Sequence, residues 1–319
     1  MDKTMQNFVY GPVPSRRLGR SLGIDLVPFK TCTYNCIYCQ LGLTTCKTIE
    51  KKEWVHIESI LQQLEKKLST EPDYITLAGS GEPTLNSGIG VLIEQIKKIT
   101  AVPVAVLTNG SLLWDAEVRS ALMESDLVIP SLDAGEQRLF QYINRPHSKI
   151  TFDRMIEGLV EFRKAFSGQY WLEVVVLGGV TVFTREIENI AGIVREIEPD
   201  RVQLNTVTRP PAEKFVISAR REHMELFIKA LGNRVEVITE FRGGDRQGRF
   251  KAGQREILDL LSLRPSTIDD IAGGLGMHRN EVVKHVEALT AKGELEKELH
   301  GWQLYYKAAR PGSKTSAYT

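Results

Sequence analysis

The run Cys32-Thr-Tyr-Asn-Cys-Ile-Tyr-Cys39 decides how the rest of this 319-residue chain is interpreted. The chain holds four cysteines, and three of them fall within this run at a C-x3-C-x2-C spacing. A structural zinc site takes four protein ligands and usually pairs two C-x2-C hooks, and no second Cys or His pair follows here. Three cysteines can instead hold a [4Fe-4S] cluster and leave one iron open to another ligand. The spacing therefore favours an iron–sulfur cluster over a zinc site or three unrelated core cysteines.

The same run, with the aromatic Tyr38 directly before its last cysteine, resembles the signature of the radical S-adenosylmethionine (SAM) enzymes. That resemblance implies that Cys32, Cys36 and Cys39 are the catalytic metal ligands of the cluster. It also implies that SAM chelates the open iron through its amino and carboxylate groups, and that the reduced cluster cleaves SAM to a 5′-deoxyadenosyl radical. The expected partner in this chemistry is an electron donor of the flavodoxin or ferredoxin type.

The segment from Tyr10 to Asp25, ahead of the cysteines, resembles the subgroup that contains the wyosine-type tRNA-modifying enzymes, the 4-demethylwyosine synthases. The likeness covers residues 8–245 and makes tRNA an expected substrate. The synthases hold a second cluster with additional N-terminal cysteines, whereas residues 1–31 of this chain contain none. Two alternatives therefore stay open. One is a radical SAM enzyme that acts on a protein, a peptide or a small molecule, and the other is a SAM- or redox-responsive DNA-binding regulator.

The composition fits a globular protein without an overall preference for membranes or nucleic acids. Hydrophobic residues make up 42% and charged residues 25% of the chain, and the net charge is +1, so any basic surface has to be local. No stretch approaches the roughly 20 apolar residues of a membrane span, and the first residues lack the apolar core of a signal peptide. Unpaired, clustered cysteines also suit a reducing compartment. We expect a cytoplasmic protein with no membrane partner.

Apolar patterns for strands and helices alternate along most of the chain, which is typical of parallel βα units. Together with the resemblance, the alternation predicts an α/β fold: a partial (β/α)6 TIM-like barrel with the cysteine loop after its first strand. The expected strands are residues 21–28, 74–78, 102–107, 127–129, 171–177, 201–204 and 235–238. The expected helices are residues 56–68, 88–99, 116–123, 152–166, 186–197 and 222–231.

Polar or glycine-rich residues follow several of the expected strands, at 79–83, 108–110, 131–133 and 205–209. Each segment alone is compatible with an ordinary turn, because Gly, Asn and Pro punctuate turns in most proteins. Active sites of parallel α/β barrels nevertheless lie at the carboxyl ends of the strands. Together, and behind the cysteine loop, the four segments therefore indicate a cofactor site.

Residues 80–83, Ser-Gly-Glu-Pro, resemble the superfamily's Gly-Gly-Glu-Pro motif, which engages the amino group of SAM, with serine in place of the first glycine. By position, the resemblance also implies ribose and carboxylate contacts after the third and fourth strands and an adenine or ribose contact after the sixth. The implied cofactor-binding residues are Tyr38, Gly79, Ser80, Gly81, Glu82, Asn109, Ser131, Asp133 and Asn205.

Three groups of basic residues stand out against the neutral total. They are Arg16, Arg17 and Arg20; Arg209; and Arg242, Arg246, Arg249 and Lys251. Such groups usually form a solvated face or a polar linker. Arginine also suits phosphate or carboxylate recognition, so contact with a substrate phosphate is the alternative.

The glycine-rich segment around the third basic group predicts a domain boundary, with a radical SAM domain at 1–245, a linker at 246–252 and a second domain at 253–319. The second domain is expected to contain helices at 254–263 and 281–292, a short helix between them with Ser266 as its N-cap in a capping box, and a hairpin at 295–307. This order resembles a winged helix-turn-helix domain.

Nucleic-acid docking by the second domain is only half supported by its charge. Residues 250–319 carry ten Lys or Arg against nine Asp or Glu, which is not the footprint of a strong phosphate binder. Local contacts could come from Arg279, Asn280, Lys284 and His285, and a packing or substrate-protein role is the alternative. The fourth cysteine, Cys46, is either a buried free thiol or a hydrogen-atom donor to a substrate radical.

Overall fold

The computed structural model describes residues 7–238 and 253–309. The chain divides into two compact units, Met1–Glu240 and Phe241–Thr319. The linker expected at 246–252, together with the basic residues Arg242, Arg246, Arg249 and Lys251, lies outside the described residues.

The first unit is an α/β fold built on one mostly parallel sheet. Its path is β1 (Val9–Ser15), β2 (Gly19–Ile24), β5 (Tyr74–Leu77), β6 (Val104–Thr108), β7 (Leu127–Pro130), β8 (Gln169–Gly178), β9 (Arg201–Thr206) and β11 (Val235–Val237). In the described residues, every neighbouring pair from β2 to β11 is parallel, while β1 is antiparallel to β2. A short strand, β10 (Ile217–Ser218), pairs antiparallel with β8. The predicted α/β class with a mostly parallel sheet is confirmed, and the strand order is consistent with a partial barrel.

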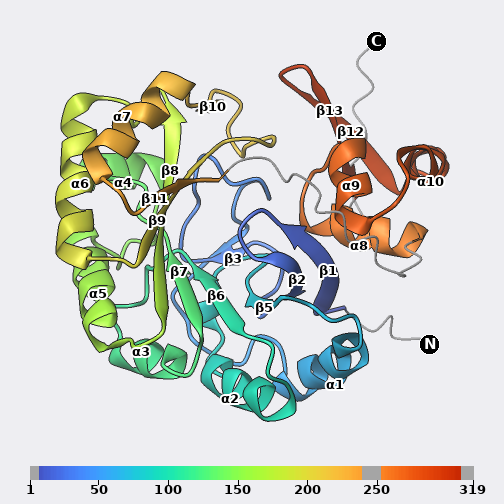
Figure 1. Ribbon diagram of the computed structural model, residues 1–319, viewed down its shortest axis with the longest axis horizontal. Helices are drawn as coiled ribbons and strands as arrows, with labels where there is room; N and C mark the ends of the chain where they lie inside the picture. Colours follow the sequence, from blue (N-terminus) through green and yellow to red (C-terminus); the bar gives the residue numbers. More distant parts are fainter. Residues whose placement is uncertain (1–6, 239–252, 310–319) are drawn as a thin grey trace. The chain divides into compact units, whose positions relative to one another are not determined.

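Figure 1 shows helices along the outer side of this curved sheet. They are α1 (Ile57–Leu68), α2 (Ile89–Ile99), α3 (Ala116–Leu122), α4 (Gln137–Ile143), α5 (Phe152–Ala165), α6 (Thr184–Ile197) and α7 (Arg221–Leu231). Their apolar residues recur at helical spacing: α1, for example, buries Ile57, Ile60 and Leu64. The main core lies between these stripes and the sheet.

A second, smaller cluster occupies the opposite face of the sheet and contains Leu18, Ala105, Leu127, Ile129 and Trp171. The strands are therefore apolar on both faces, which is why their sequences read as nearly continuous hydrophobic runs. Within the described residues, no helix is both long enough and apolar enough to cross a membrane.

Strands β1, β3 (Thr31–Cys32), β4 (Cys46–Lys47) and β10 and helix α4 were not predicted from the sequence. Strand β1 contains Pro12 and Pro14, which argue against a central strand, but β1 lies at the edge of the sheet, where proline is tolerated. Helix α4 is only seven residues long, which is too short for a clear apolar period. Strands β3 and β4 pair with each other in a two-stranded ladder.

Within its described residues, 253–309, the second unit contains three helices followed by an antiparallel hairpin. The elements are α8 (Gln254–Leu263), α9 (Ile268–Leu275), α10 (Arg279–Ala291), β12 (Leu295–His300) and β13 (Gln303–Ala308). Its buried apolar residues come from all three helices and the hairpin: Ile257, Leu260, Leu261, Ile271, Val282, Val286, Leu289, Leu295 and Tyr305.

The N-cap of α9 is Thr267, so the prediction of Ser266 was wrong by one residue. The backbone of Ser266 exchanges two hydrogen bonds with Tyr306, at 3.0 and 2.9 Å, and this bridge holds Ser266 outside the helix. The capping box forms one residue later, where Thr267 Oγ1 accepts from Asp270 N and Asp270 Oδ2 accepts from Thr267 N, both at 3.1 Å.

Candidate functional site

The cysteine loop follows β2 and is held by hydrogen bonds to segments far away in the sequence. Lys30 N donates to Ser80 O at 2.7 Å, which ties the start of the loop to the turn after β5. Asn35 N donates to Asn144 O at 3.0 Å, which ties its middle to the end of α4. The loop therefore lies at the carboxyl ends of the parallel strands, where α/β proteins place their active sites.

Each of the three clustered cysteine sulfurs accepts a hydrogen bond from a different side chain. Lys30 Nζ donates to Cys39 Sγ at 3.2 Å, Asn109 Nδ2 to Cys32 Sγ at 3.5 Å, and Asn144 Nδ2 to Cys36 Sγ at 3.5 Å. The cysteines are free and only partly exposed. Nitrogen donors beside thiolate sulfur stabilise its negative charge, and they are a usual feature around iron–sulfur clusters. Three thiols with three such donors fit a [4Fe-4S] cluster.

The described residues contain no group of three or more His, Cys, Asp or Glu side chains that could hold a single metal ion. Burial and the neighbouring Glu82 raise the pKa of the Cys32 thiol to about 12. Burial and Asp133 raise the pKa of the Cys36 thiol well above its ordinary value. Both thiols are therefore protonated at neutral pH in the protein without its metal, and binding of iron has to release protons.

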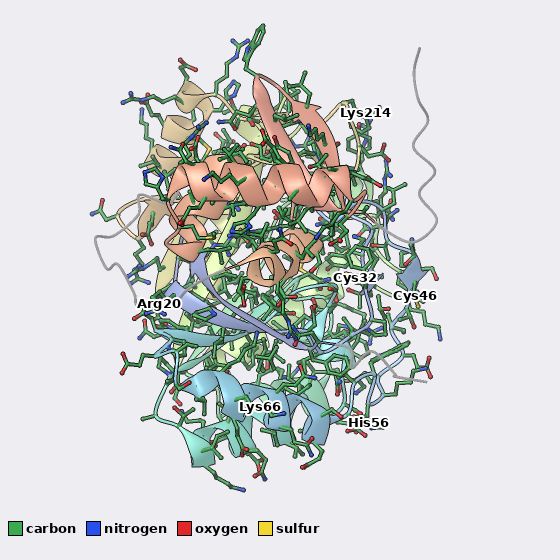
Figure 2. All side chains as sticks on the ribbon, turned by 90° about the vertical axis from the view of Figure 1, so that its right-hand side faces the viewer. Arg20, Cys32, Cys46, His56, Lys66 and Lys214 are labelled. Atoms are coloured by element: carbon green, nitrogen blue, oxygen red, sulfur yellow. The ribbon has the colours of Figure 1, made fainter. Side chains whose placement is uncertain are left out.

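Cys46 is exposed, so the prediction that it is a buried thiol was wrong. It lies in β4, whose pairing with β3 sets Cys46 opposite Thr31 and leaves its side chain at the surface. In the view of Figure 2, Cys46 lies at the outer edge of the molecule and Cys32 lies further in. Its role as a hydrogen-atom donor stays a prediction.

The turn after β5 leaves no room for larger residues at its two glycines. A Cβ atom on Gly79, whose φ is +127°, would lie 1.9 Å from Asp25 Oδ1, and one on Gly81 would lie 1.8 Å from Thr31 O. Ser80 donates to Asp25 from its backbone nitrogen at 2.5 Å and from its hydroxyl at 2.9 Å. The serine that replaces glycine in the motif therefore has a partner of its own.

Asp25 was not predicted as a site residue, and it directly follows β2, the first parallel strand. Burial raises the pKa of Asp25 to about 6, and the two hydrogen bonds from Ser80 oppose that rise. The expected strand at 21–28 placed Asp25 inside the strand, whereas β2 ends at Ile24, so its position at the carboxyl end was not recognised.

Glu82 is buried, and its carboxylate is occupied by protein donors. Oε1 accepts from Thr84 N, Thr84 Oγ1 and Thr108 Oγ1 at 3.1, 2.7 and 2.6 Å. Oε2 accepts from Asn109 N at 2.8 Å. Glu82 therefore joins the turn after β5 to the end of β6 and fixes Asn109, whose Nδ2 also donates to Thr33 Oγ1 at 2.7 Å. Burial raises the pKa of Glu82.

Asp133 joins the cysteine loop to β7 and β8. Its Oδ2 accepts from Tyr38 Oη at 2.5 Å and from Asn144 Nδ2 at 2.8 Å, and its Oδ1 accepts from Val175 N at 3.3 Å. Burial raises the pKa of Asp133 to about 6, while the bonds from Tyr38 and Asn144 lower it. The structure thus brings Tyr38 and Asp133 together with Cys36, through Asn144, which the sequence did not identify.

Ser131 and Asn205 meet at Glu173, on the neighbouring strand β8. Ser131 forms a parallel bridge with Glu173, and Asn205 Nδ2 donates to Glu173 Oε1 at 2.9 Å. Glu173 also forms an ion pair with Arg17, and both of these side chains are mostly buried. Glu173 was not predicted, because it stands within an expected strand and not after it.

Arg16, Arg17 and Arg20 do not form one basic surface. Arg17 pairs with Glu173, Arg16 Nη1 donates to Thr208 Oγ1 at 3.5 Å, and Arg20 Nη2 donates to Thr70 O at 2.9 Å. Each of the three residues has a separate partner within the first unit, and their contact with a substrate phosphate stays a prediction.

Known proteins resemble this chain over most of its length. The Radical SAM superfamily profile matches residues 26–191, which is 166 of the 319 residues. UPF0026 protein MJ1312 of Methanocaldococcus jannaschii is 36% identical over 267 residues, covering 81% of this chain and 83% of that protein. A Brachyspira hyodysenteriae protein named GTPase Obg is 40% identical over 303 residues, covering 93% of this chain and 45% of that protein.

This chain thus spans less than half of the Brachyspira protein, and its sequence lacks the G-x-x-x-x-G-K-[ST] pattern with which P-loop GTPases hold phosphates. Among solved structures, Streptococcus suis SuiB bound to S-adenosylmethionine aligns with a TM-score of 0.51 at 15% identity, covering 69% of this chain and 50% of that one. At this identity the likeness shows the shared fold alone. By its profile match and its similarity to the Methanocaldococcus protein, this chain belongs to the radical SAM superfamily and to the family of UPF0026 proteins.

Proposed function

We propose that Cys32, Cys36 and Cys39 hold the [4Fe-4S] cluster at which this chain cleaves SAM, and that the chain uses the resulting radical to modify a substrate. As a radical SAM enzyme, the protein has a [4Fe-4S] cluster and SAM as its cofactors. When bound, the cluster supplies the electron that splits SAM. The observation that carries the assignment of ligands is that each of the three thiols has its own nitrogen donor at the carboxyl edge of the sheet.

The residues proposed to surround SAM divide into two groups by burial. Asn109, Ser131 and Asn205 are partly exposed and are proposed to contact SAM directly. Glu82 and Asp133 are buried and already bonded within the protein, so they are proposed to position the residues that touch SAM. Gly79, Ser80, Gly81 and Tyr38 shape the same edge, the glycines by allowing close approach of the backbone.

The experiment is anaerobic reconstitution of the full-length protein with iron and sulfide, followed by incubation with SAM and a chemical reductant. We expect about four irons per chain and formation of 5′-deoxyadenosine. Cys36→Ala should lose both, and Cys46→Ala is the matched control because Cys46 is exposed and is not one of the proposed cluster ligands. Retention of the cluster in Cys36→Ala and its loss in Cys46→Ala would contradict the ligand assignment. SAM turnover would also distinguish an enzyme from a SAM-responsive regulator.

The proposed substrate class is tRNA, and the support is the resemblance of the segment from Tyr10 to Asp25. The second unit adds some support, since three helices and a hairpin joined by the bridge between Ser266 and Tyr306 fit a winged helix. A flavodoxin or ferredoxin type of electron donor is proposed as the partner. The test is a change in RNA mass after incubation of the reconstituted protein with total tRNA, SAM and reductant.

A peptide or small-molecule substrate is the second candidate, because one observation favours it. Arg17 is bonded within the sheet to Glu173, and the other arginines of its group also have partners in the protein. These residues are therefore not arranged as a continuous surface for phosphates. Binding to tRNA that is absent, or that does not weaken with added salt, would favour this candidate over RNA.

A further inference from the structure

Lys30 is a buried cation beside the proposed cluster ligands. The residue is 3% exposed, and its Nζ lies 3.2 Å from Cys39 Sγ. Among the residues that the structure describes, this sulfur is the hydrogen-bond partner of the Lys30 ammonium. Lysine is rarely buried without a partner of opposite charge, because a charge removed from water has to be compensated. A neutral thiol compensates it poorly, whereas a thiolate bound to a metal would compensate it well.

The backbone of Lys30 is fixed from both sides. Lys30 N donates to Ser80 O at 2.7 Å, and Lys30 O accepts from Thr45 N and Cys46 N at 3.2 and 3.1 Å. Its φ of +59° lies in the left-handed region, which glycine adopts more easily than lysine. The chain thus holds a long cationic side chain at a position where its backbone favours glycine, and it aims that side chain at a sulfur.

The donors to the three sulfurs differ in charge. Cys32 and Cys36 receive neutral amides from Asn109 and Asn144, whereas Cys39 receives an ammonium. Reduction adds one negative charge to a cluster that three thiolates already make negative. A positive charge in the same buried, weakly screened place stabilises the reduced form more than the oxidised form, and hydrogen bonds to the sulfurs act in the same direction.

We propose that Lys30 is a positioning residue for electron transfer, which raises the reduction potential of the cluster through its contact with Cys39. The inference rests on the cluster ligands proposed above. It implies that a one-electron donor of low potential reduces the cluster more completely than it would with a neutral residue at this position. Asn109 and Asn144 contribute in the same direction and by a smaller amount, because an amide carries no net charge.

The test is a redox titration of the reconstituted full-length protein without SAM, followed by electron paramagnetic resonance. Lys30→Met removes both charge and donor, Lys30→Gln removes the charge but keeps an N–H donor, and Lys30→Arg keeps the charge. Lys66→Met, in an exposed position on α1, is the matched control (Figure 2). At a fixed solution potential, the ratio of reduced to oxidised cluster should fall at least about tenfold in the Met and Gln variants, which is about 59 mV for one electron. It should change by less than about threefold, or about 28 mV, in the Arg and control variants.

Iron and sulfide content are measured on every variant, so that the cluster and its potential are judged separately. An unchanged potential in Lys30→Met and Lys30→Gln, with weaker binding of SAM, would overturn the proposal and assign Lys30 to the cofactor. Loss of the cluster from both variants would overturn it in favour of a role in assembly. A wild-type protein that binds no cluster would instead contradict the proposed function, and this outcome differs from both.

Discussion

Buried polar side chains differ in their hydrogen bonding between two regions of the first unit. One region surrounds the cysteine loop, and the other is the face of β8 and β9 that carries Glu173 and Gln203, called the inner side below. Around the cysteines, buried carboxylates such as Glu82 and Asp133 are bonded to several donors each. On β8 and β9, Gln203 is fully buried and neither atom of its amide has a partner among the described residues, and Arg17 Nη1 is also unpaired. Glu173 and Gln203 are direct neighbours across the two strands.

The two regions therefore differ in whether their buried carboxylate and amide groups have hydrogen-bond partners. Buried polar groups in native proteins are normally paired, so a fully paired network is rigid and holds its side chains in one geometry. The carboxylates of Glu82 and Asp133 have that property, although Tyr34 Oη in the cysteine loop has no partner among the described residues. On β8 and β9, the amide of Gln203 and Nη1 of Arg17 retain unused hydrogen-bonding capacity among the described residues.

The largest expected effect comes from filling the close contact at Gly81. Gly81→Ala places a Cβ 1.8 Å from Thr31 O and has to move the cysteine loop. We expect a loss of about 3 kcal/mol in the free energy of unfolding and failure to bind the cluster, measured by chemical denaturation and iron content. Gly179→Ala is the control, because Gly179 has a φ of +70° but open space around it; it should cost about 1 kcal/mol. Equal effects of the two variants would contradict the tight packing at Gly81.

The next effect concerns Glu82 as the residue that positions Asn109. In Glu82→Gln, the amide cannot accept hydrogen bonds at both ends, so either Asn109 N or the donors at the other oxygen lose their acceptor. We expect an affinity for SAM about tenfold weaker, from an unpaired buried group that costs about 1–3 kcal/mol, with the cluster retained. Asn109→Ala should weaken affinity similarly. Calorimetry on reconstituted protein measures both, with the exposed Glu65→Gln as control. Unchanged affinity in both site variants would show that SAM binds elsewhere.

A smaller effect is expected from Asp25 as the pH changes. The pKa of Asp25 is raised from 3.8 to about 6, so the folded protein binds more protons than the unfolded chain between these values. Its contribution to stability is therefore complete below pH 3.8 and is lost as the pH rises to about 6, with a slope of at most about 1.4 kcal/mol per pH unit. Asp25→Asn should flatten that decline in urea denaturation. An unchanged slope in the variant would show that other groups cause it.

The smallest effect tests the inner side of β8 and β9. Gln203→Leu replaces an unpaired buried amide with an apolar side chain of similar size, so the free energy of unfolding should stay the same or rise by up to about 1 kcal/mol. Thermal and chemical denaturation measure it, and formation of 5′-deoxyadenosine without substrate should be unchanged. Destabilisation by more than about 1 kcal/mol would mean that the amide has a structural partner, and the contrast between the two regions would disappear.

The sequence predicted the parallel strands well because each is buried on both faces, so that a run such as that of β7 is apolar throughout. The prediction failed at β1, because Pro12 and Pro14 argue against a central strand whereas β1 is an edge strand. At the site, the cysteines and the strand ends were accessible to prediction because spacing and position in the chain identify them. The positions of helix ends were less certain, as Thr267 shows, because the bridge that excludes Ser266 from the helix comes from the hairpin.

Lys30 and Asn144 were not predicted, for a physical reason. Asn144 lies 108 residues beyond Cys36 and belongs to no motif, and only the folded sheet brings the two together. Lys30 is close to the cysteines in sequence, but a lysine there reads as a surface charge until its burial is known. Glu173 likewise stands inside a strand, where residues of the two faces cannot be told apart when both faces are apolar.

The distance in sequence between Cys36 and its donor Asn144 has a consequence for the order of protein synthesis and cluster assembly. A ribosome that has just placed Cys36 must add 108 further residues before Asn144 exists, which takes about 5–20 s at common rates of synthesis. During that interval the sheet that surrounds the thiols in the folded protein is incomplete. Iron inserted then would meet cysteines without the amide donors Asn109 and Asn144. Delivery of the cluster is therefore best timed after the first unit has folded.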